Sequence, residues 1–232
     1  MRLSLFIAKS GFASRRGADL LIQQGKVSVN GKVVKEPFFR VAESDKVLVN
    51  GKVVDRKDKI YIIFNKPKGV TTTRKDKFAD KTVIDFLENK FKSLYPVGRL
   101  DKNSTGLLIL TNDGDLCFEL THPKFVTEKE YVLTVRGRFT TNDCAKAIAG
   151  VTNEGDLLRV KRIKIIKQTE YESKCSVVVA EGKKRHLRRL FRGLNFGVKS
   201  LKRVRIGKLL LGVLGPGEYI VVDRAKILKA LG

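Results

Sequence analysis

The sequence predicts an α+β fold with a largely antiparallel mixed sheet, organised as a small N-terminal domain (1–58) and a larger domain (59–232). Apolar runs rich in β-branched residues outnumber helical patterns, and the helical patterns are dispersed between them. No strand leads into a Gly-x-Gly-x-x-Gly turn, so a doubly wound parallel sheet is not indicated. The charged segment 55–59 separates the two parts and is the natural linker.

Two short helices and two hairpins are expected in the N-terminal part. Leu3, Phe6 and Ile7 share one helical face, and Ser14 can cap a second helix. The segments 26–34 and 46–54 differ at one position, and each alternates around Asn-Gly, a strong hairpin signal. We interpret the repeat as two similar hairpins, because units this short cannot bury a core of their own.

In the larger part, continuous or alternating apolar runs bounded by turn residues predict strands. These strands are expected at 60–64, 106–111, 131–135, 160–166, 175–180 and 219–222. Apolar residues at helical spacing predict helices between them. The helices are expected at 83–91, 115–120 and 181–194, and at the C-terminus over seven or eight residues.

The chain is strongly basic, with 48 Lys and Arg against 24 Asp and Glu and a net charge of +24. Such an excess indicates a polyanionic partner. The charge is uneven: residues 1–58 carry twelve basic and six acidic side chains, and residues 181–208 carry eleven and one. Apolar residues interleave with the second set, which predicts an ordered basic surface that follows phosphates.

Composition also excludes several classes of protein. No apolar run reaches the roughly 18 residues of a membrane helix, and the stretch Leu3–Ala8 is too short for a secretory signal. Three scattered cysteines and two histidines argue against a disulfide framework, a zinc finger or metal chemistry. We therefore expect a cytoplasmic protein without membrane association.

Three segments could carry chemistry. Asp101 lies in a polar loop between Arg99 and Lys102, either as an ordinary turn residue or as an ionised nucleophile or base. Tyr131 begins a strand and is by itself most simply a core or edge aromatic. If 181–194 is one helix, a face of it carries four arginines, which suits phosphate binding with or without chemistry. These are Arg185, Arg188, Arg189 and Arg192.

The N-terminal part resembles the S4 RNA-binding domain, which implies binding to structured RNA. The resemblance is carried by Arg2-Leu3, Phe6–Ala8, Ser14–Arg16, Ala18, Ile22, Gly25–Val27 and Val29–Gly31. With this part in front, the rest of the chain resembles the RsuA/RluB family of rRNA pseudouridine synthases. The matching segments, in order, are Asn65–Gly69, Gly98–Leu108, Thr111–Gly114, Lys129–Tyr131 and Glu181–Phe191.

The resemblance implies site-specific conversion of uridine to pseudouridine in ribosomal RNA, by a monomer that needs no metal and no cofactor. Tyr95–Val97, Asp115-Leu116 and Thr121–Pro123 are more similar to the large-subunit (23S, RluB-like) branch than to the small-subunit (16S) branch, which stays the alternative. The substrate would be naked rRNA or an assembling subunit. Two rivals stay open: a catalytically silent rRNA-binding or ribosome-assembly factor and, ranked last, a ribonuclease using Asp101 and His186.

The same resemblance assigns roles to three residues. Asp101 aligns with the essential aspartate, which acts on the ribose as nucleophile at the anomeric carbon or as base at C2′. Tyr131 aligns with the tyrosine that packs on the target base, and Arg188 with the basic partner of the aspartate, beside Leu187 in the pocket wall. We also expect basic residues to contact RNA, namely Arg2, Arg15, Arg16, Lys26, Lys66, Arg99, Lys183, Arg185 and Arg189.

This chain departs from the family pattern around these residues. Lys183 and Lys184 replace a pair that usually begins with Arg, His186 replaces a Gln, and Glu130 replaces a Thr. None of these changes falls on Asp101, Tyr131 or Arg188. They bear on the RNA contacts and therefore on which uridine is chosen.

Overall fold

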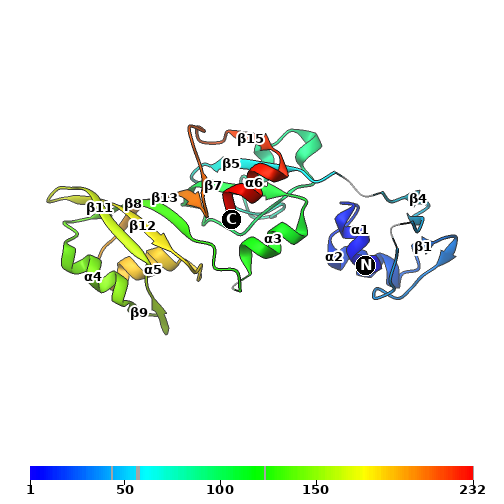
Figure 1. Cartoon of the computed structure of the whole chain (residues 1–232), viewed down its shortest axis with the longest axis horizontal. Coiled ribbons are helices and arrows are strands. Elements are labelled where there is room, and N and C mark those ends of the chain that lie inside the picture. Colours follow the sequence, from blue (N-terminus) through cyan, green and yellow to red (C-terminus); the bar gives the residue numbers. More distant parts are fainter. Residues whose placement is uncertain (43, 56–57, 123, 232) are drawn as a thin grey trace. The chain divides into compact units, whose positions relative to one another are not determined.

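The computed structural model describes residues 1–42, 44–55, 58–122 and 124–231 (Figure 1). It divides into two compact units. The first comprises Met1–Lys59 with Asn112–Gly114, and the second comprises Ile60–Thr111 with Asp115–Gly232. Each unit has its own core and is described by itself.

In the N-terminal unit, helices α1 (Leu3–Lys9) and α2 (Arg15–Gln23) pack on a four-stranded sheet. Its strand order is β2 (Lys32–Val33), β1 (Val27–Val29), β3 (Val47–Val49), β4 (Lys52–Val53). The predicted helices and hairpins are confirmed, and Ser14 caps α2 by accepting from Gly17 N at 3.0 Å. The repeated segments pair with each other through β1 and β3, so the two hairpins bury one shared core.

The second unit is built on one large sheet, in the order β11-β12-β8-β13-β7-β5-β15, with β14 and β6 paired at its side. The strands are β5 (Tyr61–Lys66), β6 (Tyr95–Pro96), β7 (Thr105–Thr111), β8 (Lys129–Arg136), β11 (Arg162–Gln168), β12 (Glu172–Val179), β13 (Val198–Ile206), β14 (Leu209–Leu210) and β15 (Tyr219–Val222). Every pairing is antiparallel except that of β13 with β7. The predicted α+β class with a largely antiparallel sheet is confirmed.

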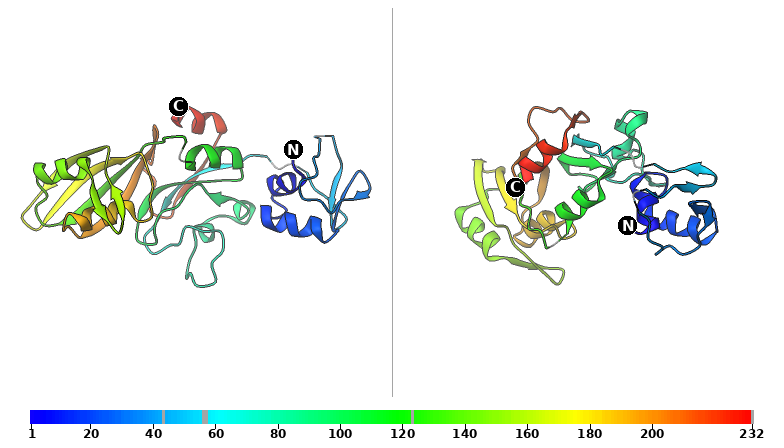
Figure 2. Two further views of the ribbon diagram at one scale, coloured as in Figure 1. Left: turned by 90° about the horizontal axis from the view of Figure 1, so that it is seen from below. Right: turned by 45° about the vertical axis from the view of Figure 1, so that its right-hand side comes forward.

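Helices cover the sheet on both faces. Helices α3 (Gly114–Thr121) and α6 (Arg224–Leu231) pack on one face of β5 and β7, and the 3₁₀ turns η1 (Val83–Phe86) and η2 (Asn89–Phe91) on the other. Figure 2 (left) shows α3 in green and α6 in red on one side of these strands. Because both faces are covered, β5 is buried along its whole length, which explains the apolar run Tyr61–Phe64 at its start.

A separate apolar cluster lies under the other half of the sheet. Strands β8, β12 and β13 pack there on α4 (Thr141–Ala149) and α5 (His186–Gly193). Helix α5 also contacts the hairpin formed by β9 (Val151–Asn153) and β10 (Asp156–Leu158). The two halves of the sheet meet where β13 pairs in parallel with β7. This pairing brings the loop before β7 next to helix α5.

Several local predictions are wrong. The helix expected at 83–91 is two 3₁₀ turns, because Leu87 adopts an extended conformation between them. The helix expected at 181–194 begins only at His186, because Arg185 lies in the left-handed region (φ 52°, ψ 32°). The strands expected at 160–166 and 175–180 are confirmed as β11 and β12, and only their bounds are shifted. The strand β13, the helix α4 and the β9–β10 hairpin have no counterpart in the prediction.

Among the described residues, no helix combines the length and the apolar character that crossing a membrane requires.

Candidate active site

The loop that carries Asp101 connects β6 to β7 and is fixed by backbone contacts. Thr72 donates from Oγ1 to Leu100 O at 2.7 Å and accepts from Leu100 N at 3.3 Å. Within the loop, Ser104 N donates to Asp101 O at 2.9 Å, and Gly69 N donates to Lys102 O at 2.8 Å. The backbone of Asp101 is therefore held between two fixed neighbours while its side chain is exposed.

Lys66 lies beneath this loop and is fully buried at the end of β5. Its ammonium donates to the carbonyl oxygens of Pro67, Lys102 and Ser104 at 3.0, 3.2 and 2.8 Å. Burial lowers the pKa of Lys66 to about 8, against the opposing influence of the Asp101 carboxylate. The prediction that Lys66 contacts RNA is wrong, since its three donors already serve the loop.

Arg188 faces Asp101 from helix α5. Its Nε lies 3.8 Å from Asp101 Oδ2, an ion pair too long for a hydrogen bond. The guanidinium also donates to Asn103 O at 3.0 Å and to Val198 O at 3.4 Å, so it is clamped between the loop and β13. Burial lowers the pKa of Arg188 and the Asp101 carboxylate raises it. Its side chain is 16% exposed and that of Asp101 is 41% exposed, so the carboxylate is the more accessible member.

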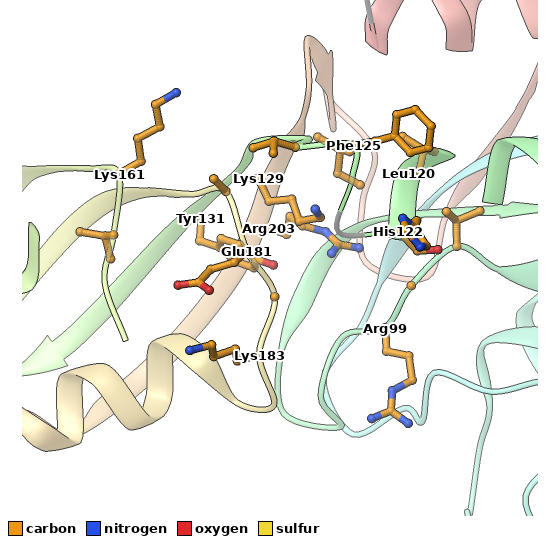
Figure 3. Close-up of a pocket in the computed structure, with 18 of the residues that line it drawn as sticks. Arg99, Leu120, His122, Phe125, Lys129, Tyr131, Lys161, Glu181, Lys183 and Arg203 are labelled. Atoms are coloured by element: carbon orange, nitrogen blue, oxygen red, sulfur yellow. The ribbon is translucent and has the colours of Figure 1, made fainter. Parts of the chain in front are cut away.

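Tyr131 on β8 lines two hollows that share part of their wall. A small one is lined by Asp101, Ser104, Tyr131 and Leu187. A larger one of about 980 Å³ extends from Tyr131 to Arg99 and His122, and Figure 3 shows its wall. A cavity of this size can hold a nucleotide. The structure thus brings Asp101, Tyr131 and Leu187 to one place, with Arg188 behind the carboxylate.

The remaining predicted RNA contacts fall into two groups. One group is exposed. It consists of Arg99, Lys183 and Arg185 around the cavities and of Arg2, Arg15, Arg16 and Lys26 on the N-terminal unit. Arg189 forms the other group. Its side chain is buried and donates to Asp156 Oδ2 at 2.8 Å and to Asn153 O at 2.5 Å. The prediction of an RNA contact for Arg189 is therefore wrong, because this residue ties α5 to the β9–β10 hairpin.

The dense basic segment 181–208 is less available than its composition suggests. Several of its cations are paired with acidic side chains of other elements, as Arg192 is with Glu154, Lys199 with Glu172, and Arg205 with Glu130. The Glu130 of the atypical Lys-Glu-Tyr segment also accepts from Ser176 Oγ at 2.7 Å, so it has a structural role.

His186 lies in the interior, where it contacts the backbone. His186 is buried with Nε2 2.9 Å from Arg159 O, and burial lowers its pKa, which favours the neutral form. Within the described ranges, no group of three or more His, Cys, Asp or Glu side chains could hold a metal ion. No pattern in the sequence pointed to Thr72, and Lys66 was expected at the surface instead of under the loop.

Comparison with known proteins identifies the family. Residues 60–192 match the family model for RNA pseudouridylate synthase, and residues 1–47 match that of the S4 domain. The chain belongs to the RNA pseudouridine synthase family. As in other pseudouridine synthases, the activity is the isomerisation of uridine in RNA. The identification agrees with the resemblance found in the sequence.

Similar pseudouridine synthases cover the chain from end to end. It is 38% identical to the ribosomal large subunit pseudouridine synthase B of Bacillus subtilis, over 99% of this chain and 96% of that one. It is 36% identical to the dual-specificity RNA pseudouridine synthase RluF of Escherichia coli, over 94% of this chain and 74% of that one. A crystal structure of a pseudouridylate synthase is 28% identical, with a TM-score of 0.70 and 99% of each chain covered.

Proposed function

We propose that this pseudouridine synthase modifies one specific uridine in large-subunit ribosomal RNA, with Asp101 as its catalytic aspartate. The observation that carries the proposal is the pairing of an exposed Asp101 carboxylate with a clamped Arg188, beside Tyr131 and next to a nucleotide-sized cavity. The large-subunit substrate is supported by the similarity to the Bacillus subtilis enzyme over nearly the full length of both chains.

The reaction needs an ionised carboxylate in either of two routes. In the first, Asp101 attacks C1′, the C1′–N1 bond breaks, and uracil leaves with the bonding electron pair. The base then turns, C5 forms a bond to C1′ as the Asp101–C1′ bond breaks, and the proton on C5 is lost while N1 gains one. In the second, Asp101 removes the C2′ proton, and a C1′=C2′ double bond forms as the C1′–N1 bond breaks and uracil leaves with the bonding pair. The base turns, C5 adds to C1′ as Asp101 returns the proton to C2′, and the proton on C5 is lost while N1 gains one. Uridine and pseudouridine are isomers, so atoms and electrons balance within the substrate.

Arg188 and Tyr131 support this chemistry in different ways. The guanidinium faces the carboxylate with an opposite charge, and its clamp on Asn103 O and Val198 O leaves Arg188 little freedom, so it can hold the carboxylate in one direction. Rotation of the base requires that the uridine leave its helix, and an aromatic ring can stack on the flipped base. Tyr131 is the aromatic side chain that lines both hollows.

Binding would be shared between the two units. The exposed Arg2, Arg15, Arg16 and Lys26 suit phosphate contacts of a docking S4 domain, here residues 1–58. On the catalytic domain, residues 59–232, the exposed Arg99, Lys183 and Arg185 surround the cavities. We further propose that the protein acts as a cytoplasmic monomer, on naked rRNA or on an assembling subunit.

Mapping of pseudouridine in rRNA from cells with and without this protein tests the proposal. We expect the loss of one pseudouridine from the large-subunit rRNA, restored by wild-type protein but not by Asp101→Asn. A loss from the small-subunit rRNA would move the substrate to 16S rRNA. If the protein binds rRNA and no pseudouridine disappears, the enzyme assignment fails and a silent binding factor is the better description.

A further inference from the structure

Two basic side chains in the wall of the large cavity have no role in the site described so far. Arg203 on β13 is the cross-strand partner of Tyr131, and Lys129 lies two residues before Tyr131 on the same face of β8. Both line the cavity of about 980 Å³. Figure 3 shows the nitrogen-bearing ends of Lys129 and Arg203 next to each other, in the space between Tyr131 and His122.

Arg203 is buried, charged and incompletely bonded. Its side chain is 3% exposed, and its Nε donates to Leu107 O at 2.7 Å. Its Nη2 is buried without a hydrogen-bond partner in the described part of the chain. Guanidinium groups stay protonated in proteins, and a buried charged donor without a partner is costly. The orphaned Nη2 therefore indicates a partner that the protein itself does not supply.

Lys129 adds a second cation to the same place. It donates to Thr127 O at 2.9 Å, and no carboxylate among the described residues forms an ion pair with it. Burial lowers its pKa, and the charge of Arg203 lowers it further. The acidic side chain in this cavity wall, Glu181, forms no ion pair with either cation. Two partly desolvated like charges side by side are relieved by an anion between them.

We propose that Arg203 and Lys129 form an anion subsite that takes an anionic oxygen of the target nucleotide. The inference rests on the proposed function, because it places the nucleotide in this cavity with its base at Tyr131. Two oxygens have the required chemistry: a phosphodiester oxygen of the RNA backbone, and an oxygen of the uracil anion released when the C1′–N1 bond breaks. The two sources have different consequences. A phosphate contact exists in the bound substrate, whereas the uracil anion exists only during the reaction.

The test uses the full-length Lys129→Met variant and a large-subunit rRNA transcript as probe. Lys161→Met is the matched control, because Lys161 lines the same cavity but is exposed and paired with Glu128 at 2.7 Å. The affinity is measured as a function of salt, and the rate of pseudouridine formation under single-turnover conditions. For a phosphate ligand, the log–log salt slope of Lys129→Met becomes shallower by about 0.7. For a uracil oxygen, the slope is unchanged and the rate falls at least about tenfold, as expected for a contact made in the transition state.

Either result supports the subsite provided that Lys161→Met behaves as wild type. Unchanged slope and rate in Lys129→Met overturn the proposal. Lys129→Arg, which keeps the charge, is expected to retain wild-type values, and equal impairment of the Arg and Met variants would also overturn it. A wild-type protein that forms no pseudouridine on rRNA transcripts or on assembling ribosomal subunits would refute the proposed function instead, so the two failures are distinguishable.

Discussion

Gly106 is the position where a single methyl group should damage the catalytic domain most clearly. It follows the Asp101 loop at the start of β7 and has a φ of +101°, which favours glycine. A Cβ added there would overlap Arg203 O and lie 2.8 Å from Arg203 N, both backbone atoms of the paired strand β13. Gly106→Ala would therefore have to part the one parallel strand pairing of the described sheet.

The cost can be estimated from two contributions. A non-glycine residue in a sparsely populated backbone region costs about 1–3 kcal/mol. Forcing packed backbone apart costs about 1–3 kcal/mol more. The sum, about 2–6 kcal/mol, is a large share of the roughly 5–15 kcal/mol that stabilises an ordinary domain. Gly155→Ala is the matched control, because Gly155 has a φ of +78° and an added Cβ would meet nothing within 4 Å. It should cost only about 1–2 kcal/mol.

Urea unfolding followed by tyrosine fluorescence measures this difference in the right part of the chain. All five tyrosines lie within residues 60–232, and the chain has no tryptophan, so the signal reports the catalytic domain alone. We expect the free energy of unfolding to fall by about 1–3 kcal/mol more in Gly106→Ala than in Gly155→Ala, because both positions have a positive φ and only Gly106 meets packed backbone. Equal losses in the two variants would refute the close approach of β7 and β13.

Other predictions concern charge. Because burial lowers the pKa of Lys66 from 10.5 to about 8, the unfolded state binds more protons between these pH values. The unfolding free energy of wild type relative to Lys66→Met should thus rise from pH 8 to 10.5, and a flat difference in urea titrations would contradict it. Arg189→Met should lower the unfolding free energy measured in urea, because it removes the bonds of the buried guanidinium to Asp156 Oδ2 and Asn153 O, and an unchanged value would contradict this role. Arg185→Ala should leave the free energy of unfolding in urea unchanged and weaken binding to rRNA in a filter assay. A loss of stability with unchanged binding would contradict this prediction. Deletion of residues 1–58 should weaken the affinity for rRNA and change the free energy of unfolding of the catalytic domain little. Equal affinity of the truncated and full-length proteins would show that the S4 domain does not dock the RNA.

The predictable parts of the fold are those with a local cause. The hairpins at Asn30-Gly31 and Asn50-Gly51 follow from residues that accept positive φ, and β7 follows from an unbroken apolar run. Strand β13 escaped prediction because basic residues interrupt its apolar alternation, and one of them, Arg203, is buried. Its Nε donates to a carbonyl of β7, which only the assembled sheet provides.

The wrong site predictions have the same origin in long-range partners. Lys66 reads as a surface cation after a strand, but the carbonyls of Lys102 and Ser104 enclose it. Arg189 reads as one of an arginine stripe, but its partner Asp156 stands on a hairpin that no local pattern indicated. The pairing of Asp101 with Arg188 came from the family resemblance, since no local pattern in the sequence relates residues so far apart.

The most direct test of the account is pseudouridine formation by purified wild-type protein and Asp101→Asn on one large-subunit rRNA transcript. Release of tritium from 5-³H-uridine reports loss of the C5 hydrogen, and filter binding of the same RNA reports affinity. We expect wild-type protein to release tritium from one uridine, and Asp101→Asn to release none while it binds the RNA as tightly. Turnover by Asp101→Asn at the wild-type rate would contradict the account.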